Sequence, residues 1–465
     1  MKKNANIIED SKNIYMIGIG GTGMSGLARL LLSIDKKVSG SDKNQSPVLS
    51  DLSERGARIN HIQRGRNIPR STDVVIYSHA IMPDNPEYRM AAGYSIPMLT
   101  YPEAVGFVMR RKRGIAVAGT HGKTTTSSLV VSVLIAGGLC PSFLIGGEIR
   151  SLGNSGVGNS DFLVVEACEY KRSFLNYQPE IAIVTNIEKD HLDYYSDIRE
   201  IKAAFRKFIS GVKAGGKVIY CAEDSNAAGV AGKIARESKI SYGIRQGDWT
   251  AGNIRLYRDY MEYDCLFRGK MAAEKVKSRA QGMHNVLNSL AAVSCAAHLG
   301  LPFSSVRDGL ENFRGVHRRC EILGSVSGVT VIDDYGHHPT EISFTLRTVR
   351  GMFPESRLIV VFQPHQYSRT RILLKDFARA FSMADKIVVP DIYFVRDSIN
   401  EKKLVNAQIL AEKIRENGKE ALYLPSFGEI VAYLAEIVKK GDVVLTIGAG
   451  PVNKVAIDLL SKLGA

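Results

Sequence analysis

The feature of this chain that most constrains its fold is one local pattern repeated along its length. A short run of β-branched apolar residues ends in Gly, Ser, Thr, Asp or another polar residue, and a helix-like segment follows. Apolar runs without polar alternation are typical of strands buried on both faces of a parallel sheet. Alternation of such strands with helices predicts doubly wound α/β domains. The runs span residues 14–19, 74–77, 115–118, 162–165, 181–184, 329–332, 358–362 and 443–447.

The length of the chain and two connector-like segments predict three domains. At ~150 residues per domain, the 465 residues correspond to about three domains. Arg110–Arg113 precedes a new strand, and Phe313–Arg319 has the character of a second connector. Between residues 250 and 270 apolar and polar residues alternate, which predicts an antiparallel hairpin inserted in the middle domain. The predicted domains are 1–112, 113–320 and 321–465.

Composition excludes several classes of protein. The chain has 61 Lys+Arg and 47 Asp+Glu, a net charge of +14 that could serve anionic small substrates, nucleic acid or no specific partner. None of the common nucleic-acid-binding signatures occurs. No apolar run approaches the ~20 residues that cross a bilayer, and the start with Lys2 and Lys3 lacks the apolar stretch of a secretory signal. The six cysteines are far apart without a CxxC pair, which disfavours a disulfide scaffold or a zinc site and predicts a cytoplasmic location.

A glycine-rich motif follows the first predicted strand. GIGGTGMSG at residues 18–26 contains GxGxxG and precedes an apolar helix predicted over Leu27–Ile34. Glycines allow the backbone to approach a diphosphate, and a helix N-terminus offers free N–H groups. Asp42 follows the second strand at the spacing of a ribose-binding acid. The motif predicts a dinucleotide or nucleotide-diphosphate site and leaves NAD and a UDP-sugar both open.

A shortened P-loop follows a later strand. The stretch Gly119-Thr120-His121-Gly122-Lys123-Thr124-Thr125-Thr126 precedes a helix predicted over Ser127–Ile135, although strict Walker spacing would require glycine at Val117. Backbone amides of such a loop cradle phosphate oxygens, Lys123 can reach the β- and γ-phosphates, and Thr124 can ligate Mg²⁺. This motif favours ATP over NAD.

Further polar residues stand at the ends of other predicted strands. Glu166 ends one, and Asp190 and His191 follow the next; carboxylates there are hard-metal ligands suited to Mg²⁺. Asn285 and Asn288 share one face of a helix at spacing i, i+3, where amides can pair with an adenine edge or serve only as capping or surface residues.

The last domain carries two polar segments, DDYGHHPTE at 333–341 and QPHQYSRTR at 363–371, each after a buried strand. Their histidines and arginines suit recognition of carboxylate or phosphate groups. A zinc site made of His337, His338 and His365 is disfavoured, because no cysteine or further spaced ligand accompanies them. Ser78 and His79 likewise follow a buried strand, in this case in the first domain.

Taken together and in this order, the motifs resemble those of the Mur ligases, the ATP-dependent amide ligases of peptidoglycan precursor synthesis, and within that family the alanine-adding members. The resemblance covers nearly the full length. It is carried by GIGGTGMSG (18–26), GTHGKTTT (119–126), TNIEKDHLDYY (185–195), GMHNVLNSLAA (282–292), DDYGHHPTEI (333–342) and FQPHQYSRT (362–370).

The resemblance implies an N-terminal Rossmann-like domain that binds the UDP-sugar, a central P-loop ATPase domain with a mostly parallel sheet, and a C-terminal Rossmann-like domain that closes over the site. It implies ATP and Mg²⁺ as cofactors and UDP-N-acetylmuramate and L-alanine as substrates. The chain is then expected to be a monomer or a weak homodimer without a nucleic-acid partner or a membrane span. The carboxylate of the sugar would become an acyl phosphate that the alanine amine attacks.

The resemblance also assigns roles to residues. The catalytic set would be Lys123, His191, His337 and Arg369, and the Mg²⁺ ligands Thr124, Glu166 and His191. The nucleotide would be bound by Gly119, Thr120, His121, Gly122, Lys123, Thr124, Thr125, His284, Asn285 and Asn288. The sugar nucleotide and alanine would be bound by Gly20, Gly21, Gly23, Met24, Ser25, Asp42, Ser78, His79, Tyr335 and His365.

The chain departs from the family pattern at three positions. Cys168 and Lys171 stand where relatives often carry acids, and Gln366 stands where relatives often carry arginine. Three other functions stay open at this point. They are a recycling ligase that attaches a whole tripeptide to the same sugar, an NAD-dependent dehydrogenase, and a nucleotide-regulated binding protein without turnover.

Overall fold

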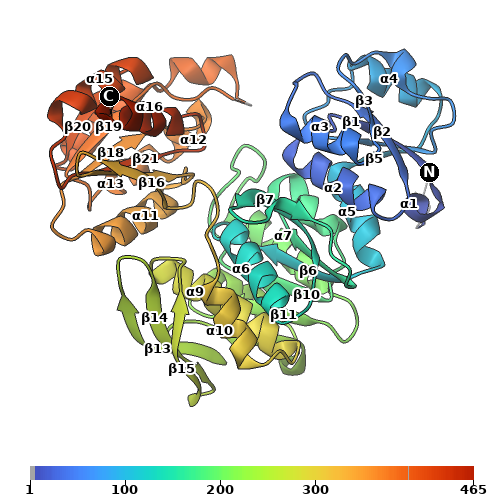
Figure 1. Cartoon of the computed structure of the whole chain (residues 1–465), viewed down its shortest axis with the longest axis horizontal. Coiled ribbons are helices and arrows are strands. Elements are labelled where there is room, and N and C mark those ends of the chain that lie inside the picture. Colours follow the sequence, from blue (N-terminus) through green and yellow to red (C-terminus); the bar gives the residue numbers. More distant parts are fainter. Residues whose placement is uncertain (1–5, 396, 465) are drawn as a thin grey trace.

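The computed structural model describes residues 6–395 and 397–464. Within these residues the strands form three sheets, of five, ten and six strands. Figure 1 shows three lobes that follow one another along the chain, with the N- and C-terminal lobes on opposite sides above the central one. The predicted three-domain α/β class is therefore confirmed. The N-terminal residues Lys2 and Lys3 lie outside the described part of the chain.

The N-terminal lobe contains a fully parallel sheet in the order β3-β2-β1-β4-β5. Ile14 and Met16 of β1 belong to one apolar cluster and Tyr15 and Ile17 to another, so both faces of this strand are buried. The strand order reverses between β1 and β4, and ligands bind at such a point beyond the carboxyl ends of the strands. The elements are α1 (Ile7–Asp10), β1 (Asn13–Ile17), α2 (Thr22–Leu32), β2 (Lys37–Ser41), α3 (Pro47–Glu54), β3 (Arg58–Asn60), β4 (Val74–Tyr77), α4 (Pro86–Gly93), β5 (Met98–Thr100) and α5 (Tyr101–Arg110).

The central lobe is built on the sheet order β15-β14-β13-β12-β11-β10-β6-β9-β7-β8. The strands from β12 to β7 in this order are parallel, and β13, β14 and β15 form an antiparallel meander where the sequence predicts a hairpin. The elements are β6 (Arg113–Ala118), α6 (Lys123–Ala136), β7 (Ser142–Ile149), β8 (Gly153–Gly156), β9 (Phe162–Glu166), β10 (Ile181–Val184), α7 (Ile198–Ser210), β11 (Lys217–Cys221), α8 (Ser225–Ala231), β12 (Lys239–Tyr242), β13 (Trp249–Leu256), β14 (Met261–Phe267), β15 (Lys270–Ser278), α9 (Met283–His298) and α10 (Phe303–Glu311).

The C-terminal lobe has the sheet order β16-β17-β21-β18-β19-β20, in which the pairing of β16 with β17 is antiparallel and the others are parallel. Every residue of β18 and β21 is buried, as the unalternating apolar runs predict. The elements are β16 (Glu321–Val326), β17 (Val329–Asp334), α11 (Pro339–Met352), β18 (Leu358–Phe362), α12 (Tyr367–Ile372), α13 (Leu374–Arg379), β19 (Lys386–Val389), α14 (Ala407–Glu416), β20 (Glu420–Tyr423), α15 (Phe427–Ile437), β21 (Val443–Ile447) and α16 (Asn453–Gly464).

Two helices begin earlier in the structure than the sequence predicts. The helix predicted from Leu27 begins at Thr22, and the helix predicted from Ser127 begins at Lys123. Glycine and threonine are poor helix formers, so apolar periodicity does not detect a first turn made of them. Both helices start immediately after a glycine of a loop that is typical of phosphate binding. Their free N-terminal amides therefore lie at the end of that loop.

We propose domain limits at 112 and 320. They are supported by the helix α5, which ends at Arg110, by β6, which starts at Arg113, and by β16, which starts at Glu321.

Candidate active site

The P-loop connects β6 to α6 and has a backbone that only glycine adopts readily. Gly119 and Gly122 have φ values of +144° and +79°. A Cβ at Gly119 would lie 1.9 Å from the Thr185 hydroxyl, which donates to the carbonyl of His121 at 2.6 Å. Asn186 Oδ1 accepts from the His121 amide at 2.8 Å. The end of β10 therefore fixes this loop, and the amides that open α6 are left for phosphate oxygens.

Lys123 is held over its own loop by a carboxylate. Its Nζ donates to the carbonyl oxygens of Gly119 (2.6 Å) and Thr120 (3.0 Å) and lies 3.0 Å from Oε2 of Glu169. Burial acts against the charge of the ammonium group, but Glu169 raises the pKa of Lys123 above its ordinary value. Glu169 is not among the site residues predicted from the sequence. The sequence does contain an indication of a role, because Glu169 is an acid near Glu166 in a stretch where other acids of the family pattern are replaced.

The predicted Mg²⁺ ligands Thr124 and Glu166 face two adjacent glycines of β7. Glu166 Oε2 accepts from the Gly146 amide at 2.8 Å, and a Cβ at Gly147 would lie 2.6 Å from Cγ2 of Thr124. Gly146 leaves room beside the Glu166 carboxylate, and Gly147 leaves room beside the methyl group of Thr124. A carboxylate and a threonine hydroxyl supply the oxygen donors that Mg²⁺ prefers. His191, the third predicted ligand, lies on the loop after β10 with its ring 4.7 Å from that of Tyr170.

The predicted base-side residues lie at the start of α9. Asn288 Nδ2 donates to Asn285 Oδ1 at 2.7 Å, and Thr126 donates to Asn288 Oδ1 at 3.1 Å, so Asn288 supports the first turn of α6. Asn285 lines an open cleft of about 460 Å³ together with Thr125. His284 stacks on Phe344, and burial lowers its pKa to about 4. The open cleft has more room for the base of the nucleotide than the hydrogen-bonded side-chain amides of Asn285 and Asn288 leave between them.

Four residues predicted from the resemblance come together in the C-terminal lobe: the substrate contacts Tyr335 and His365 and the catalytic residues His337 and Arg369. The ring of His337 lies 5.6 Å from that of Tyr335 and 6.0 Å from that of His365, whose Nδ1 is 3.4 Å from Nη1 of Arg369. Burial lowers the pKa of His337 to about 4. His338 turns away, with Nε2 3.2 Å from the carbonyl of Lys189, so the three histidines of the disfavoured zinc site do not converge.

The positions that depart from the family pattern are placed as follows. Cys168 lies beside Lys123 and Glu169. Lys171 has φ +50° and places its ammonium group 5.5 Å from the centre of the Tyr170 ring. Gln366 precedes α12, and its side chain donates to the carbonyl of Val395 at 3.4 Å.

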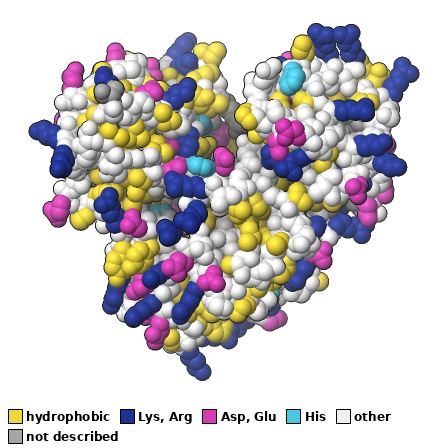
Figure 2. Space-filling view, viewed as in Figure 1, with side chains coloured by type: hydrophobic (Ala, Val, Ile, Leu, Met, Phe, Trp, Pro, Cys, Tyr) yellow, Lys and Arg dark blue, Asp and Glu magenta, His cyan; other side chains and the backbone are white. Residues whose placement is uncertain are grey.

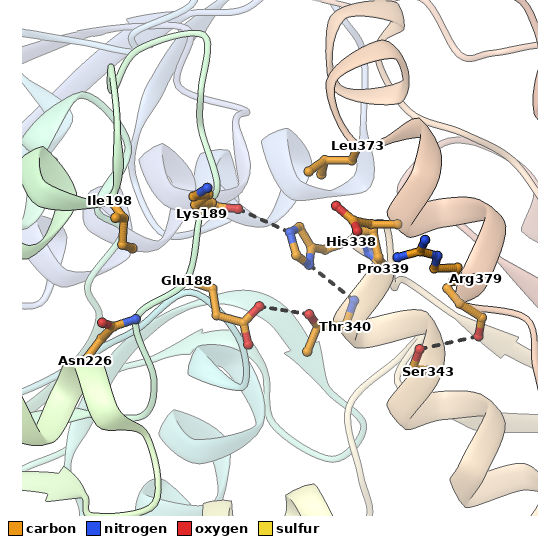
Figure 3. A pocket seen from close by; sticks show the side chains of 12 residues that line it. Glu188, Lys189, Ile198, Asn226, His338, Pro339, Thr340, Ser343, Leu373 and Arg379 are labelled. Carbon is orange, nitrogen blue, oxygen red and sulfur yellow. Dashed lines mark hydrogen bonds between the residues drawn. The ribbon is translucent and has the colours of Figure 1, made fainter.

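Contacts between the central and C-terminal lobes close the site. His121 Nδ1 lies 3.1 Å from Glu341 Oε1, and Arg369 Nη2 donates to Asp190 Oδ1 at 3.2 Å. Thr340 donates to Glu188 at 2.8 Å, as Figure 3 shows. In Figure 2 the surface is hollowed between the two upper lobes, and acidic, basic and histidine side chains gather next to this hollow.

In the N-terminal lobe the glycine motif forms the turn between β1 and α2. Asp42 Oδ2 accepts from the Gly20 amide at 2.9 Å, and Gly21 precedes the first residue of α2. A Cβ at Gly23 would lie 2.7 Å from the Tyr101 ring. The amides of Gly18, Ile19 and Gly21 donate to backbone carbonyls, so the amides at the switch point that could bind a diphosphate are those that open α2.

The other predicted residues of this lobe differ in their exposure. Ser78 lies beside Gly18, whereas His79 is exposed. Met24 and Ser25 are buried, and the Ser25 hydroxyl donates to the carbonyl of Thr22 at 3.2 Å. The Ser25 amide donates to the carbonyl of Gly21 at 2.8 Å, so a donor contact from this pair to a ligand would have to come from the Met24 amide.

Three family models match consecutive parts of the chain. They are described as the Mur ligase family catalytic domain (residues 13–113), the Mur ligase middle domain (117–296) and the Mur ligase glutamate ligase domain (318–450).

Known proteins resemble the chain over almost its whole length. A UDP-N-acetylmuramate–L-alanine ligase of Caldanaerobacter subterraneus subsp. tengcongensis is 41% identical, with 98% of each chain covered. The crystal structure of the UDP-N-acetylmuramate–alanine ligase of Thermotoga maritima matches with a TM-score of 0.80 and 29% identity, covering 97% of this chain and 98% of that one. A murein peptide ligase from Psychrobacter arcticus shares the fold, with a TM-score of 0.67 and 24% identity over 97% and 99%. The chain therefore belongs to the Mur ligase family.

Proposed function

We propose that this enzyme joins L-alanine to the lactyl carboxylate of UDP-N-acetylmuramate and converts ATP to ADP and phosphate. The observation that carries the proposal is the buried P-loop lysine, Lys123, which Glu169 holds against its own loop at a strand–helix junction that also presents Thr124. The relatives that are about 41% identical carry the alanine-adding name, and the murein peptide ligase is less similar in both sequence and fold. These relatives favour alanine over a tripeptide as the acceptor.

The first chemical step gives the carboxylate a leaving group. A carboxylate is a poor electrophile, so its oxygen attacks the γ-phosphorus of ATP, the bond to the β-phosphate oxygen breaks, and an acyl phosphate forms. Lys123 stabilises the transferring phosphoryl group once its ammonium leaves Glu169. Thr124, Glu166 and His191 are the residues that would hold Mg²⁺. An ion bound by these residues would offset the charge between the triphosphate and the carboxylate.

The second step forms the amide. The amine of alanine attacks the acyl carbon, and the tetrahedral intermediate expels phosphate. Arg369 offers a planar fork of donors for the alanine carboxylate, and His337 is neutral near pH 7, so it can accept a hydrogen bond from the amine. Contacts such as His121–Glu341 keep the lobes together, which excludes water from the acyl phosphate.

The glycine turn with Asp42 is proposed to hold the UDP moiety. Gly20, Gly21 and Gly23 bring the backbone close, and Ser78 lies beside the same turn. Titration with NADH, followed by its fluorescence, is expected to show no binding at this turn, whereas UDP-N-acetylmuramate binds. Saturable NADH binding that UDP-N-acetylmuramate displaces would favour the dehydrogenase alternative.

We further propose that the enzyme acts in the cytoplasm as a monomer or weak homodimer. The free cysteines of the described residues fit a reducing compartment. Separately, no helix within residues 6–395 and 397–464 is both long and apolar enough to cross a membrane. Sedimentation velocity over a range of protein concentrations measures the oligomeric state.

The activity is tested by mixing the purified enzyme with UDP-N-acetylmuramate, amino acid and Mg-ATP and measuring ADP. ADP release is expected to require both the sugar nucleotide and L-alanine, and to exceed release with the tripeptide. Lys123→Ala is expected to abolish turnover while binding of the UDP-sugar persists. ADP release independent of either acceptor, or a preference for the tripeptide, would contradict the proposal. Wild-type enzyme that binds both nucleotides without turnover would instead support a regulatory binding protein.

A further inference from the structure

A cluster of potential metal ligands lies between the central and C-terminal lobes, apart from the proposed Mg²⁺ ligands. His121 comes from the P-loop, Glu188 from the loop after β10, and His338 from the residue before α11. One ligand atom from each, a ring nitrogen or a carboxylate oxygen, lies within 4.8 Å of the other two. Glu188 and His338 also line a cavity of about 490 Å³, shown in Figure 3, which gives an ion a path from solvent.

The strongest sign of a missing ligand is the ring of His121. Its side chain is 7% exposed, and its Nε2 atom is buried and makes no hydrogen bond among the described residues, although it faces the Glu188 carboxylate at ion-pair distance. Buried polar atoms without a partner are rare and call for an explanation. Nδ1 lies 3.1 Å from Glu341, so the opposite ring nitrogen is held by a carboxylate. Histidines that ligate metals are commonly oriented by a carboxylate in this way, with the other nitrogen free for the ion.

The other two side chains are able to turn toward that nitrogen. Glu188 Oε2 lies 3.5 Å from His121 Nε2, and the Glu188 side chain is 36% exposed, so its carboxylate has room to rotate. His338 makes two long contacts, at 3.2 Å to the carbonyl of Lys189 and at 3.3 Å from the amide of Thr340. Hydrogen bonds of this length are weak, and replacing one with a metal bond costs little.

The charge around His121 also suits a cation. The ion pairs that the described part of the chain gives Glu188 and Glu341 are all to histidines, His121 and His337. Asp190, the next acid along the loop, is already paired with Arg369. His121 is uncharged when it ligates a metal, so a divalent ion would balance the two carboxylates that face this ring, Glu188 and Glu341.

We propose that His121, Glu188 and His338 bind a divalent transition-metal ion, with zinc as the best match, and that this ion ties the two lobes together. Two imidazole nitrogens and one carboxylate are a recognised zinc set, whereas Mg²⁺ prefers oxygen donors. Zinc bonds of ~2.0–2.2 Å place ligands roughly 3.3–3.6 Å apart, so binding draws the three side chains inward. Because the ligands come from two lobes, the ion stabilises the arrangement in which they meet.

The test is zinc binding to the full-length, chelator-treated enzyme without nucleotide or Mg²⁺, measured by isothermal titration calorimetry. One zinc per chain is expected. His338→Ala is expected to weaken binding at least tenfold, and Glu188→Gln is a second variant that keeps a hydrogen-bond acceptor for Thr340. His317→Ala is the matched control, because His317 also pairs with a glutamate, at 3.1 Å, but lies outside the cluster. It is expected to bind zinc as the wild type does.

A second pair of variants separates this site from the proposed Mg²⁺ ligands. His191→Ala and Glu166→Gln are expected to keep the zinc affinity of the wild type, and cobalt in place of zinc is expected to show visible absorption that Glu188→Gln alters. Zinc binding that His191→Ala removes and His338→Ala keeps would overturn the proposal. Absence of zinc binding in the wild type would overturn it as well, and would leave His121 as an imidazolium between Glu188 and Glu341. Neither outcome depends on turnover, so the proposed ligase activity stands or falls separately.

Discussion

Lys123 Nζ lies 3.0 Å from Oε2 of Glu169, and the two side chains are only 13% and 3% exposed. The pair holds the P-loop lysine against the carbonyls of Gly119 and Thr120 at the place where a phosphate would bind. The lysine is therefore held in its charged form inside the loop, and its carboxylate partner, Glu169, comes from the segment after β9. We propose on this basis that Glu169 belongs to the nucleotide site, although it lies outside the P-loop motif itself.

Glu169→Gln tests this pair. The substitution removes the negative partner of a buried ammonium group, so the free energy of unfolding is expected to fall by about 1–3 kcal/mol, with reduced kcat. Urea denaturation measures the change. Glu180→Gln is the control, since it breaks an exposed pair with Arg113 and is expected to cost less than about 1 kcal/mol. Equal destabilisation by the two variants would contradict a structural role for Glu169.

Gly146→Ala tests the proposed Mg²⁺ ligands. The added Cβ would lie 3.0 Å from an oxygen of Glu166 and force this carboxylate to move. The apparent KM for Mg²⁺ is expected to rise roughly five- to thirtyfold, a cost of ~1–2 kcal/mol, while the KM for the UDP-sugar changes little. Gly229→Ala in α8 is the control, because nothing lies within 4 Å of its Cβ. A rise confined to the KM for the sugar would show that Glu166 serves another purpose.

Arg369→Lys tests closure of the C-terminal lobe. Lysine cannot reproduce the fork that contacts both Asp190 and His365. We expect kcat/KM for alanine to fall roughly 10- to 100-fold and the ligand-induced decrease in radius of gyration, measured by small-angle scattering, to shrink. Arg371→Lys alters the pair with Glu401, which is more exposed, and serves as the control. A wild-type radius of gyration that does not change with nucleotide and UDP-sugar bound would argue against closure altogether.

The reactivity of Cys168 follows from its burial. Burial, together with the charge of Glu169, raises the pKa of this thiol to about 12, although Lys123 acts in the opposite direction. At pH 8 only ~10⁻⁴ of it is thiolate, and that fraction rises about tenfold for each pH unit up to pH 11. Iodoacetamide followed by peptide mass spectrometry is expected to label the exposed Cys140 first. Labelling of both cysteines at one rate at pH 8 would contradict this.

The sequence predicts the parts of the site that a single strand–loop–helix unit contains. The P-loop and the glycine turn were predictable because glycine, lysine and threonine between a buried strand and a helix have few other uses. The i, i+3 pair of Asn285 and Asn288 was predictable too, although hydrogen bonds turn Asn288 toward Thr126. In these cases the chemistry and the geometry are local.

The sequence does not predict contacts that depend on how the lobes meet. His121 and Glu341 are 220 residues apart, and Asp190 and Arg369 are 179 apart. Their proximity results from packing of one lobe on another, which no local pattern records. Met24 and Ser25 show that the sequence motif also fails to predict which of its side chains are accessible. Both residues belong to the glycine motif, but because α2 begins at Thr22 their side chains lie on the buried side of this helix.

The most direct measurement of the central claim is the fate of the carboxylate oxygens. UDP-N-acetylmuramate labelled with ¹⁸O in its carboxylate is incubated with the enzyme, Mg-ATP and L-alanine, and the released phosphate is analysed by mass spectrometry. An acyl phosphate predicts that each phosphate released carries one oxygen from the carboxylate. Phosphate that remains unlabelled while the amide accumulates would contradict the account.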